Sequence, residues 1–122
     1  MTMTFRDNKP IYLQIAEQIM DRVLRGELPE GERIPSVREY ASGAGVNPNT
    51  VMRSYDWLEQ GGMIFNRRGI GFFVADNARQ IIGKMRKEEF FQQEMVLFLE
   101  KLKSFGITPD QLKSIYEEYL TK

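Results

Sequence analysis

Hydrophobic residues in the first part of the chain recur at the spacing of an amphipathic helix. One apolar stripe runs through residues 10–25, where the intervals between apolar residues repeat every four positions. Asn8 stands where an N-cap is expected, Pro10 suits the first turn, and Gly26 is placed to end the helix. The stripe consists of Ile11, Ile15, Ile19 and Val23.

Two more helices are predicted between residues 36 and 60, with a short turn between them. Ser36 and Glu39 have the spacing of a capping box, and Gly45 ends the brief helix that they open. Asn47 and Pro48 then supply an N-cap and a first-turn proline. Two helices joined in this way form a helix-turn-helix. The apolar face of the second helix consists of Val51, Tyr55 and Leu58.

A β-hairpin is predicted after this motif. Residues 63–65 and 72–74 are short apolar runs, and a basic, glycine-containing segment at 67–71 separates them. The order of helix, helix-turn-helix and hairpin predicts a winged helix-turn-helix, an α+β fold that is mainly α. We expect this domain to occupy residues 1–76.

Residues 77–122 are expected to form a tail of two helices. Phe91, Met95, Phe98, Leu102 and Phe105 are spaced 4, 3, 4 and 3 apart, which is a heptad-like seam. Thr108 and Gln111 then have the spacing of a capping box, and Pro109 suits the first turn of a second helix. The seam either packs back onto the winged helix or joins a second chain. The excess of apolar side chains favours dimerisation.

Composition argues against catalysis and metal binding. The 122 residues include neither cysteine nor histidine, which removes thiol nucleophiles, the commonest general base and the usual zinc ligands. We therefore expect a non-enzymatic protein that needs no cofactor or metal. No apolar run is long enough to span a membrane, so a cytoplasmic protein is expected. Net charge is zero, and residues 1–74 hold nine basic and nine acidic side chains, which is unusual for a protein that contacts phosphates.

Three polar residues at the start of the 48–60 helix match the chemistry of major-groove recognition. Asn49 and Arg53 project away from the apolar face, with Thr50 beside them. An asparagine amide pairs with adenine, an arginine with guanine, and a threonine methyl contacts thymine. A solvated helix face is the alternative, but the surrounding helix-turn-helix and basic hairpin favour DNA.

Three further arginines are candidate DNA contacts. Arg38, near the start of its helix, either reaches DNA or pairs with a neighbouring glutamate. Arg67 and Arg68 at the hairpin tip either contact the minor groove and backbone or are solubilising surface residues. Asp56 lies one turn beyond Arg53 and is a candidate ion-pair partner for it.

Residues 10–75 resemble the GntR family of bacterial regulators. The matching pieces are Pro10-Ile11-Tyr12, Pro35-Ser36-Val37-Arg38-Glu39, Gly45-Val46-Asn47-Pro48-Asn49-Thr50-Val51, and Arg67-Arg68-Gly69 before Phe73-Val74. The short helical tail is similar to that of the YtrA-type branch, in which it serves dimerisation.

The resemblance implies a homodimer that binds double-stranded DNA at palindromic operators, often as a repressor. A small-molecule effector is not specified, and a winged helix used for protein contact without DNA is the alternative function. Ser36 belongs to the matched 35–39 motif and is therefore counted among the expected DNA contacts. The DNA-contacting residues are then Ser36, Arg38, Asn47, Asn49, Thr50, Arg53, Arg67, Arg68 and Gly69.

Overall fold

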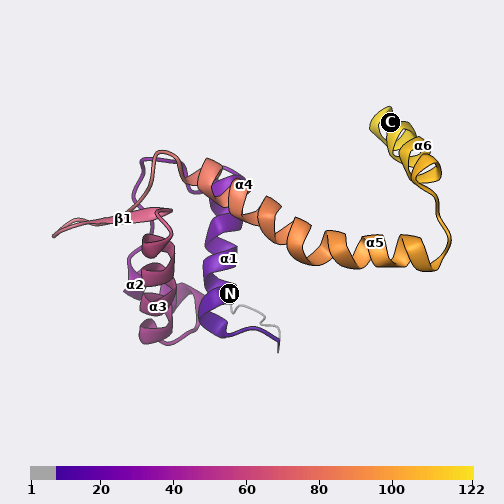
Figure 1. The fold of residues 1–122 in the computed structure, drawn as a ribbon. Coiled ribbons are helices and arrows are strands. Elements are labelled where there is room, and N and C mark those ends of the chain that lie inside the picture. Colours follow the sequence, from indigo (N-terminus) through magenta and orange to yellow (C-terminus); the bar gives the residue numbers. More distant parts are fainter. Residues whose placement is uncertain (1–7) are drawn as a thin grey trace. The chain divides into compact units, whose positions relative to one another are not determined.

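A computed structural model describes residues 8–122 and divides the chain into two compact units, the first ending at Lys84 and the second running from Met85 to Lys122. The described residues are mostly helical and contain one two-stranded sheet (Figure 1). None of the described helices combines the length and the apolar character needed to span a bilayer.

Three helices form the body of the first unit: α1 (Ile11–Leu24), α2 (Val37–Ala44) and α3 (Pro48–Gln60). Helix α3 packs against both α1 and α2. The expected apolar stripes form the core, since one face of each helix is removed from water. Ile11, at the start of α1, is the exception, because it is 46 % exposed. Its largest fully buried side chains include Ile15, Ile19, Val23, Val51, Tyr55 and Leu58.

Local capping signals explain where α2 and α3 begin. The Ser36 hydroxyl accepts a hydrogen bond from the Glu39 N–H at 3.1 Å, and the Ser36 N–H donates to the Glu39 carboxylate at 3.0 Å, which completes the predicted capping box. Asn47 caps α3, with Pro48 in the first turn. The expectation for α1 was wrong, because its N-cap is Pro10 and no side chain caps it.

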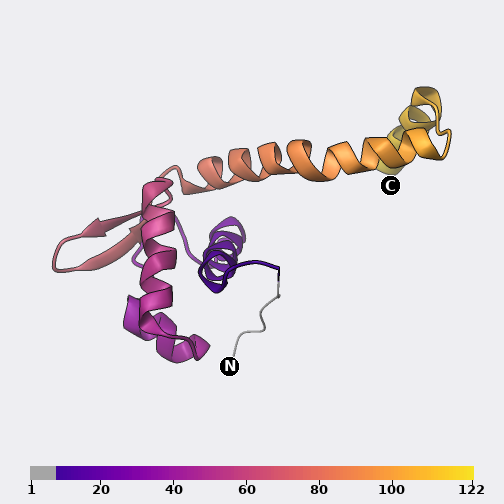
Figure 2. The same ribbon diagram turned by 60° about the horizontal axis from the view of Figure 1, so that its bottom comes forward.

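The predicted hairpin consists of β1 (Ile64–Arg67) and β2 (Gly71–Val74), which pair antiparallel beside α3 (Figure 2). Residues 31–34 line the other edge of β2. The Ile34 N–H donates to the Phe72 carbonyl at 2.9 Å, and the Gly31 N–H donates to the Val74 carbonyl at 2.8 Å. On the β1 side, the Asn66 N–H donates to the Glu59 carboxylate of α3 at 3.3 Å, so the hairpin is tied on both edges to the rest of the winged helix.

Helix α4 (Ala78–Glu89) begins within the first unit. Ala78 and Ile82 are completely buried, so the first turns of α4 contribute to the core of the winged helix. The compact unit accordingly ends at Lys84, beyond the division between residues 76 and 77 that composition suggested. The change in composition marks the start of α4. The first turns of α4 still belong to the core of the winged helix, because their side chains are buried.

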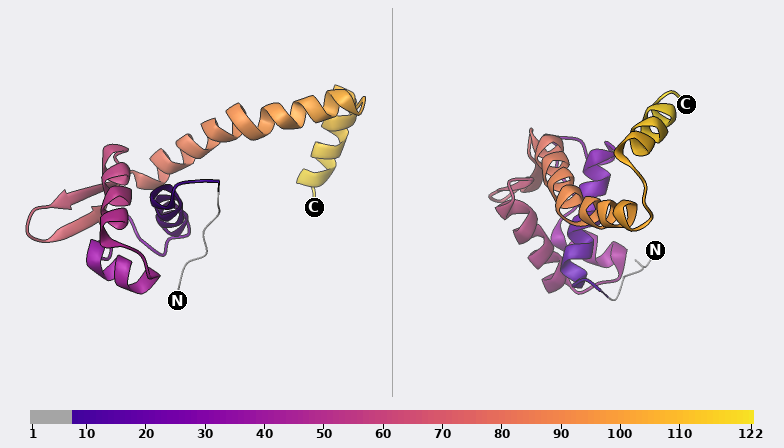
Figure 3. Two further views of the ribbon diagram at one scale, coloured as in Figure 1. Left: turned by 90° about the horizontal axis from the view of Figure 1, so that it is seen from below. Right: turned by 45° about the vertical axis from the view of Figure 1, so that its right-hand side comes forward.

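The second unit contains the end of α4, a π-helical turn η1 (Phe90–Glu94), α5 (Met95–Ser104) and α6 (Pro109–Leu120). A loop through Gly106 joins α5 to α6, which runs in a new direction (Figure 3). The Thr108 and Gln111 side chains form the capping box of α6. None of residues 85–122, all of which are described, is buried, so this unit has no interior of its own.

Candidate nucleic-acid interface

The start of α3 presents a row of polar side chains. Asn49 and Arg53 are exposed, and Thr50 is half-buried. The Asn47 side chain accepts a hydrogen bond from the Asn49 N–H at 2.8 Å, so it stabilises the helix start. The predicted recognition residues thus share one face, beside a helix N-terminus that carries partial positive charge.

A shallow groove of about 400 Å³ runs between the starts of α3 and α1. Both helices supply its walls, and the three candidate recognition residues line one side. The lining residues are Pro10, Ile11, Tyr12, Asn49, Thr50 and Arg53.

Arg53 stacks on an aromatic ring. Its guanidinium carbon lies 4.1 Å from the centre of the Tyr12 ring, which is cation–π geometry. Arg53 forms no ion pair with Asp56 or with any other described residue. The sequence offered Asp56 as a candidate ion-pair partner, but the structure shows no such pair and places the guanidinium over the Tyr12 ring.

Two buried hydroxyls hold α3 in place. The Ser54 hydroxyl donates to the Tyr12 carbonyl at 2.7 Å and so joins α3 to α1. The Tyr55 hydroxyl donates to the Pro35 carbonyl at 2.6 Å, directly before α2. Burial raises the pKa of Tyr55, so the phenol stays neutral and remains a donor. Both bonds fix the recognition face relative to its neighbours.

At the start of α2, Ser36 is occupied by its capping role and Arg38 is exposed. The backbone N–H of Ser36 lowers the pKa of the Glu39 carboxylate, which stays ionised. Glu39 pairs with Arg33 at 3.6 Å rather than with Arg38. Arg38 forms no ion pair with any described residue, which leaves its charge available to a phosphate.

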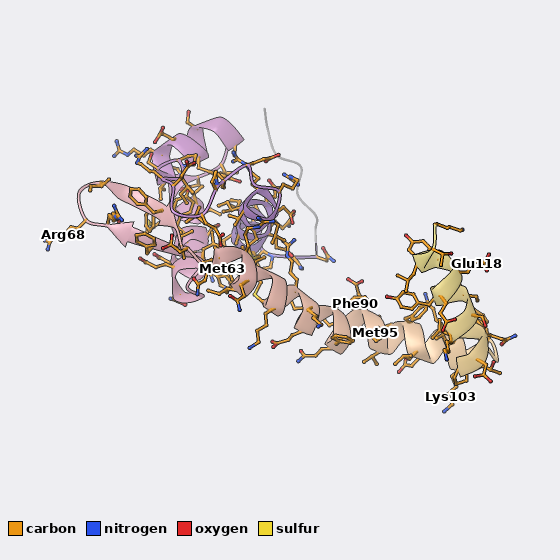
Figure 4. The ribbon with its side chains drawn as sticks, turned by 90° about the horizontal axis from the view of Figure 1, so that it is seen from above. Met63, Arg68, Phe90, Met95, Lys103 and Glu118 are labelled. Carbon is orange, nitrogen blue, oxygen red and sulfur yellow. The ribbon has the colours of Figure 1, made fainter. Side chains whose placement is uncertain are left out.

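The two arginines of the hairpin tip differ in their surroundings. Arg67 lies over the rings of Phe73 and Phe65, at 4.7 and 5.6 Å from their centres. Arg68 extends from the tip of the hairpin into solvent (Figure 4). Gly69 follows with a φ of +79°, the left-handed conformation that this turn requires. Arg68 is therefore the more available of the two.

The predicted tail residues lie on η1, α5 and the turn after them. Met95 and Phe98 line a groove of about 770 Å³ between α5 and α6, together with Phe90 from η1 and Leu112 and Tyr116 from α6. Phe90, rather than Phe91, lies in this groove because a π turn aligns residues five apart. Phe91 is half-exposed, Leu102 is half-buried, and Phe105 is 75 % exposed.

Two residues that shape the interface were not identified from the sequence. Tyr12 belongs to the Pro10–Tyr12 motif, in which the sequence pattern gives Pro10 a place in the first turn and Ile11 a place in the apolar stripe but predicts no role for Tyr12. Arg33 donates from Nε to the Ile70 carbonyl at 3.2 Å and lies against Gly71, beside the turn of the hairpin. No local pattern indicates either contact, because each joins elements far apart in the chain.

Comparison with known proteins supplies the family. Residues 11–74 match the model of the bacterial regulatory proteins of the gntR family. This chain belongs to the GntR family. It is 40 % identical to the HTH-type transcriptional regulator YhcF of Bacillus subtilis over 112 residues, which cover 92 % of this chain and 91 % of that protein. It is also 42 % identical to the HTH-type transcriptional repressor YtrA of B. subtilis over 82 residues, 66 % of this chain and 63 % of that protein.

Solved structures of similar proteins show the same fold. A GntR-family transcriptional regulator from Bacteroides thetaiotaomicron is 46 % identical, with a TM-score of 0.81 over 92 % of this chain and 97 % of that chain. The DNA-binding domain of AraR, solved in complex with operator ORR3, is 25 % identical, with a TM-score of 0.54 over 62 % of this chain and 90 % of that chain.

These comparisons confirm three predictions. The fold is the winged helix-turn-helix of the GntR family, the resemblance to YtrA-type regulators holds, and the protein is a DNA-binding transcription regulator. Its relatives are regulators rather than enzymes.

Proposed function

We propose that this GntR protein is a homodimeric, sequence-specific repressor that binds an inverted repeat in double-stranded DNA. The observation that carries the proposal is the exposed polar face at the start of α3, where Asn49, Thr50 and Arg53 lie together on a GntR winged helix. In this assignment the helix enters the major groove and these side chains reach base edges.

The surrounding residues position the domain on the DNA backbone. Arg38 at the start of α2 and Arg68 at the hairpin tip are exposed cations outside the recognition helix, suited to phosphate or minor-groove contact. Ser36 and Asn47 hold the two helix starts, and Gly69 shapes the turn that carries Arg68. Arg67, stacked on Phe73, supports the hairpin and adds positive charge beside its tip.

The dimer is supported by the exposed apolar surface of the second unit. None of residues 85–122 is buried, although the unit carries six phenylalanine or leucine side chains that are at least 46 % exposed. A second copy would cover this surface, and two-fold symmetry then requires an inverted repeat. These six residues are Phe91, Leu97, Phe98, Leu99, Phe105 and Leu120.

Repression is proposed because similar proteins, YtrA and NagR of B. subtilis, are named transcriptional repressors. A regulator of this kind works where the chromosome is, so we assign it to the cytoplasm and assign it no catalytic activity. The winged helix as a pure protein-contact module is the second candidate, and the neutral charge of residues 1–74 favours it.

Selection from a random duplex library tests the proposal. The wild-type chain is expected to enrich an inverted repeat, with affinity that falls steeply as salt rises. Arg53→Ala should weaken binding to the selected duplex by about 1–3 kcal/mol and lose discrimination at one base pair of each half-site. Gln60→Ala, at the far end of α3, is the matched control and should bind like wild type. Enrichment of no sequence, together with a shallow salt dependence, would favour the protein-contact module.

A further inference from the structure

We infer that Tyr12 is a positioning residue for base recognition, whose ring holds the guanidinium of Arg53 in the orientation that reads a base. The inference rests on the proposed role of Arg53. It assigns part of the specificity to α1, a helix outside the helix-turn-helix.

The contact itself is close, and Arg53 has no competing partner. The guanidinium carbon lies 4.1 Å above the centre of the Tyr12 ring, and no ion pair to a described residue draws the side chain elsewhere. An exposed arginine on a helix otherwise samples many rotamers, and ordering it on binding opposes association. Stacking in the free protein removes much of that cost before DNA arrives.

Tyr12 is well suited to act as a fixed platform. Its carbonyl accepts a hydrogen bond of 2.7 Å from the Ser54 hydroxyl, and Ser54 is completely buried one residue after Arg53. The Ser54 hydroxyl also lies 3.2 Å from the Thr50 carbonyl of its own helix. The backbone beneath the ring is thereby joined to the same turn of α3 that carries the guanidinium, so the two groups move together.

Stacking also leaves the guanidinium able to read a base. The ring covers one face of the planar group, whereas the five N–H donors point outward from its edge. These donors remain available in the groove that Asn49 and Thr50 line. The Tyr12 hydroxyl has no hydrogen-bond partner among the described residues. We therefore expect the ring, rather than the hydroxyl, to position the Arg53 guanidinium.

Four variants of the full chain test the inference on the duplex that wild type selects from a random library. Tyr12→Leu should weaken binding about three- to tenfold and reduce discrimination at the base pair that Arg53→Ala no longer distinguishes. Tyr12→Phe should bind within about twofold of wild type, because it keeps the ring. With Arg53→Ala already present, adding Tyr12→Leu should weaken binding by less than about twofold, because no guanidinium remains for the ring to position.

Each failure has a distinct meaning. If Arg53→Ala leaves binding unchanged, the proposed role of Arg53 is wrong and the inference falls with it. If Arg53→Ala weakens binding but Tyr12→Leu has the same effect with and without Arg53, only the inference is overturned. An equal loss in Tyr12→Phe and Tyr12→Leu would also overturn it, because the hydroxyl would then be the active group.

A spectroscopic measurement keeps the test independent of how well the variants fold. In the NMR spectrum of the free wild-type chain, the Nε–H proton of Arg53 should be shifted upfield by the ring current of Tyr12. The shift should persist in Tyr12→Phe. An Arg53 signal at the position of an unstacked arginine would overturn the inference whatever the DNA-binding data show.

Discussion

A charge placed in the apolar surface of the second unit should separate the proposed dimer. Phe98 lies in the groove between α5 and α6 and is 46 % exposed in the single chain. In a dimer the remaining exposed half would be covered by the partner. Phe98→Glu replaces an aromatic ring at that position by a carboxylate that has no designated cation to pair with.

The size of the effect follows from exposure and symmetry. Burying a whole phenylalanine is worth roughly 1.5–3 kcal/mol, so covering about half of Phe98 contributes about 1 kcal/mol in each chain. Burying an unpaired carboxylate there costs about 2–3 kcal/mol more in each chain. Because both chains carry the change, dimerisation weakens by about 6–8 kcal/mol, which is roughly a 10⁴- to 10⁶-fold loss in the association constant.

Sedimentation equilibrium at micromolar concentration measures this directly. Wild type should be a dimer and Phe98→Glu a monomer. Binding to the full inverted repeat should fall much further than for a single base-contact variant, because the second half-site is no longer held nearby. Gln93→Glu adds the same charge on an exposed polar position of η1 and should remain dimeric. A monomeric wild type, or a dimeric Phe98→Glu, would refute the reasoning and leave the seam as part of a single-chain structure.

Three further changes test the winged helix. Replacing Arg67 and Arg68 together by alanine should weaken binding about equally across operator variants and flatten the salt dependence, and an unchanged slope would make the tip an ordinary surface. Tyr55→Phe removes the 2.6 Å bond to the Pro35 carbonyl and should lower the free energy of unfolding by about 1–2 kcal/mol in urea titrations; no change would mean that water replaces the hydroxyl. Ser36→Ala should cost about 1 kcal/mol of stability by the same measurement, whereas a larger loss of DNA affinity at equal stability would give the hydroxyl a direct DNA contact.

The elements that sequence predicted well are those set by neighbouring residues. The capping boxes at Ser36 and Thr108 form as expected, because each needs only a partner three positions along the chain. The hairpin turn likewise depends on Gly69 at one position. The polar face of α3 follows from helical periodicity alone, so the candidate recognition residues are brought together as predicted.

Contacts between distant elements were not accessible in this way. Arg53 has a suitable carboxylate one turn away in Asp56, yet it stacks on Tyr12, whose proximity depends on how α1 packs against α3. The π turn at Phe90–Glu94 also escapes prediction, because apolar spacing assumes 3.6 residues per turn throughout. One extra residue in a turn is enough to place Phe90 in the groove of the second unit.

The attachment of the hairpin has a consequence for the width of a half-site. Segment 31–34 pairs with β2, and Arg33 bonds both to the Ile70 carbonyl and to Glu39 at the start of α2. The hairpin tip therefore keeps a set separation from the helix starts. One inserted base pair moves the phosphates beyond it by about 3.4 Å along the axis and turns them by roughly 34°. Because the hairpin is held on both edges, its tip cannot shift to meet the displaced phosphates. An inserted base pair within a half-site should therefore reduce affinity more than a substituted base pair does.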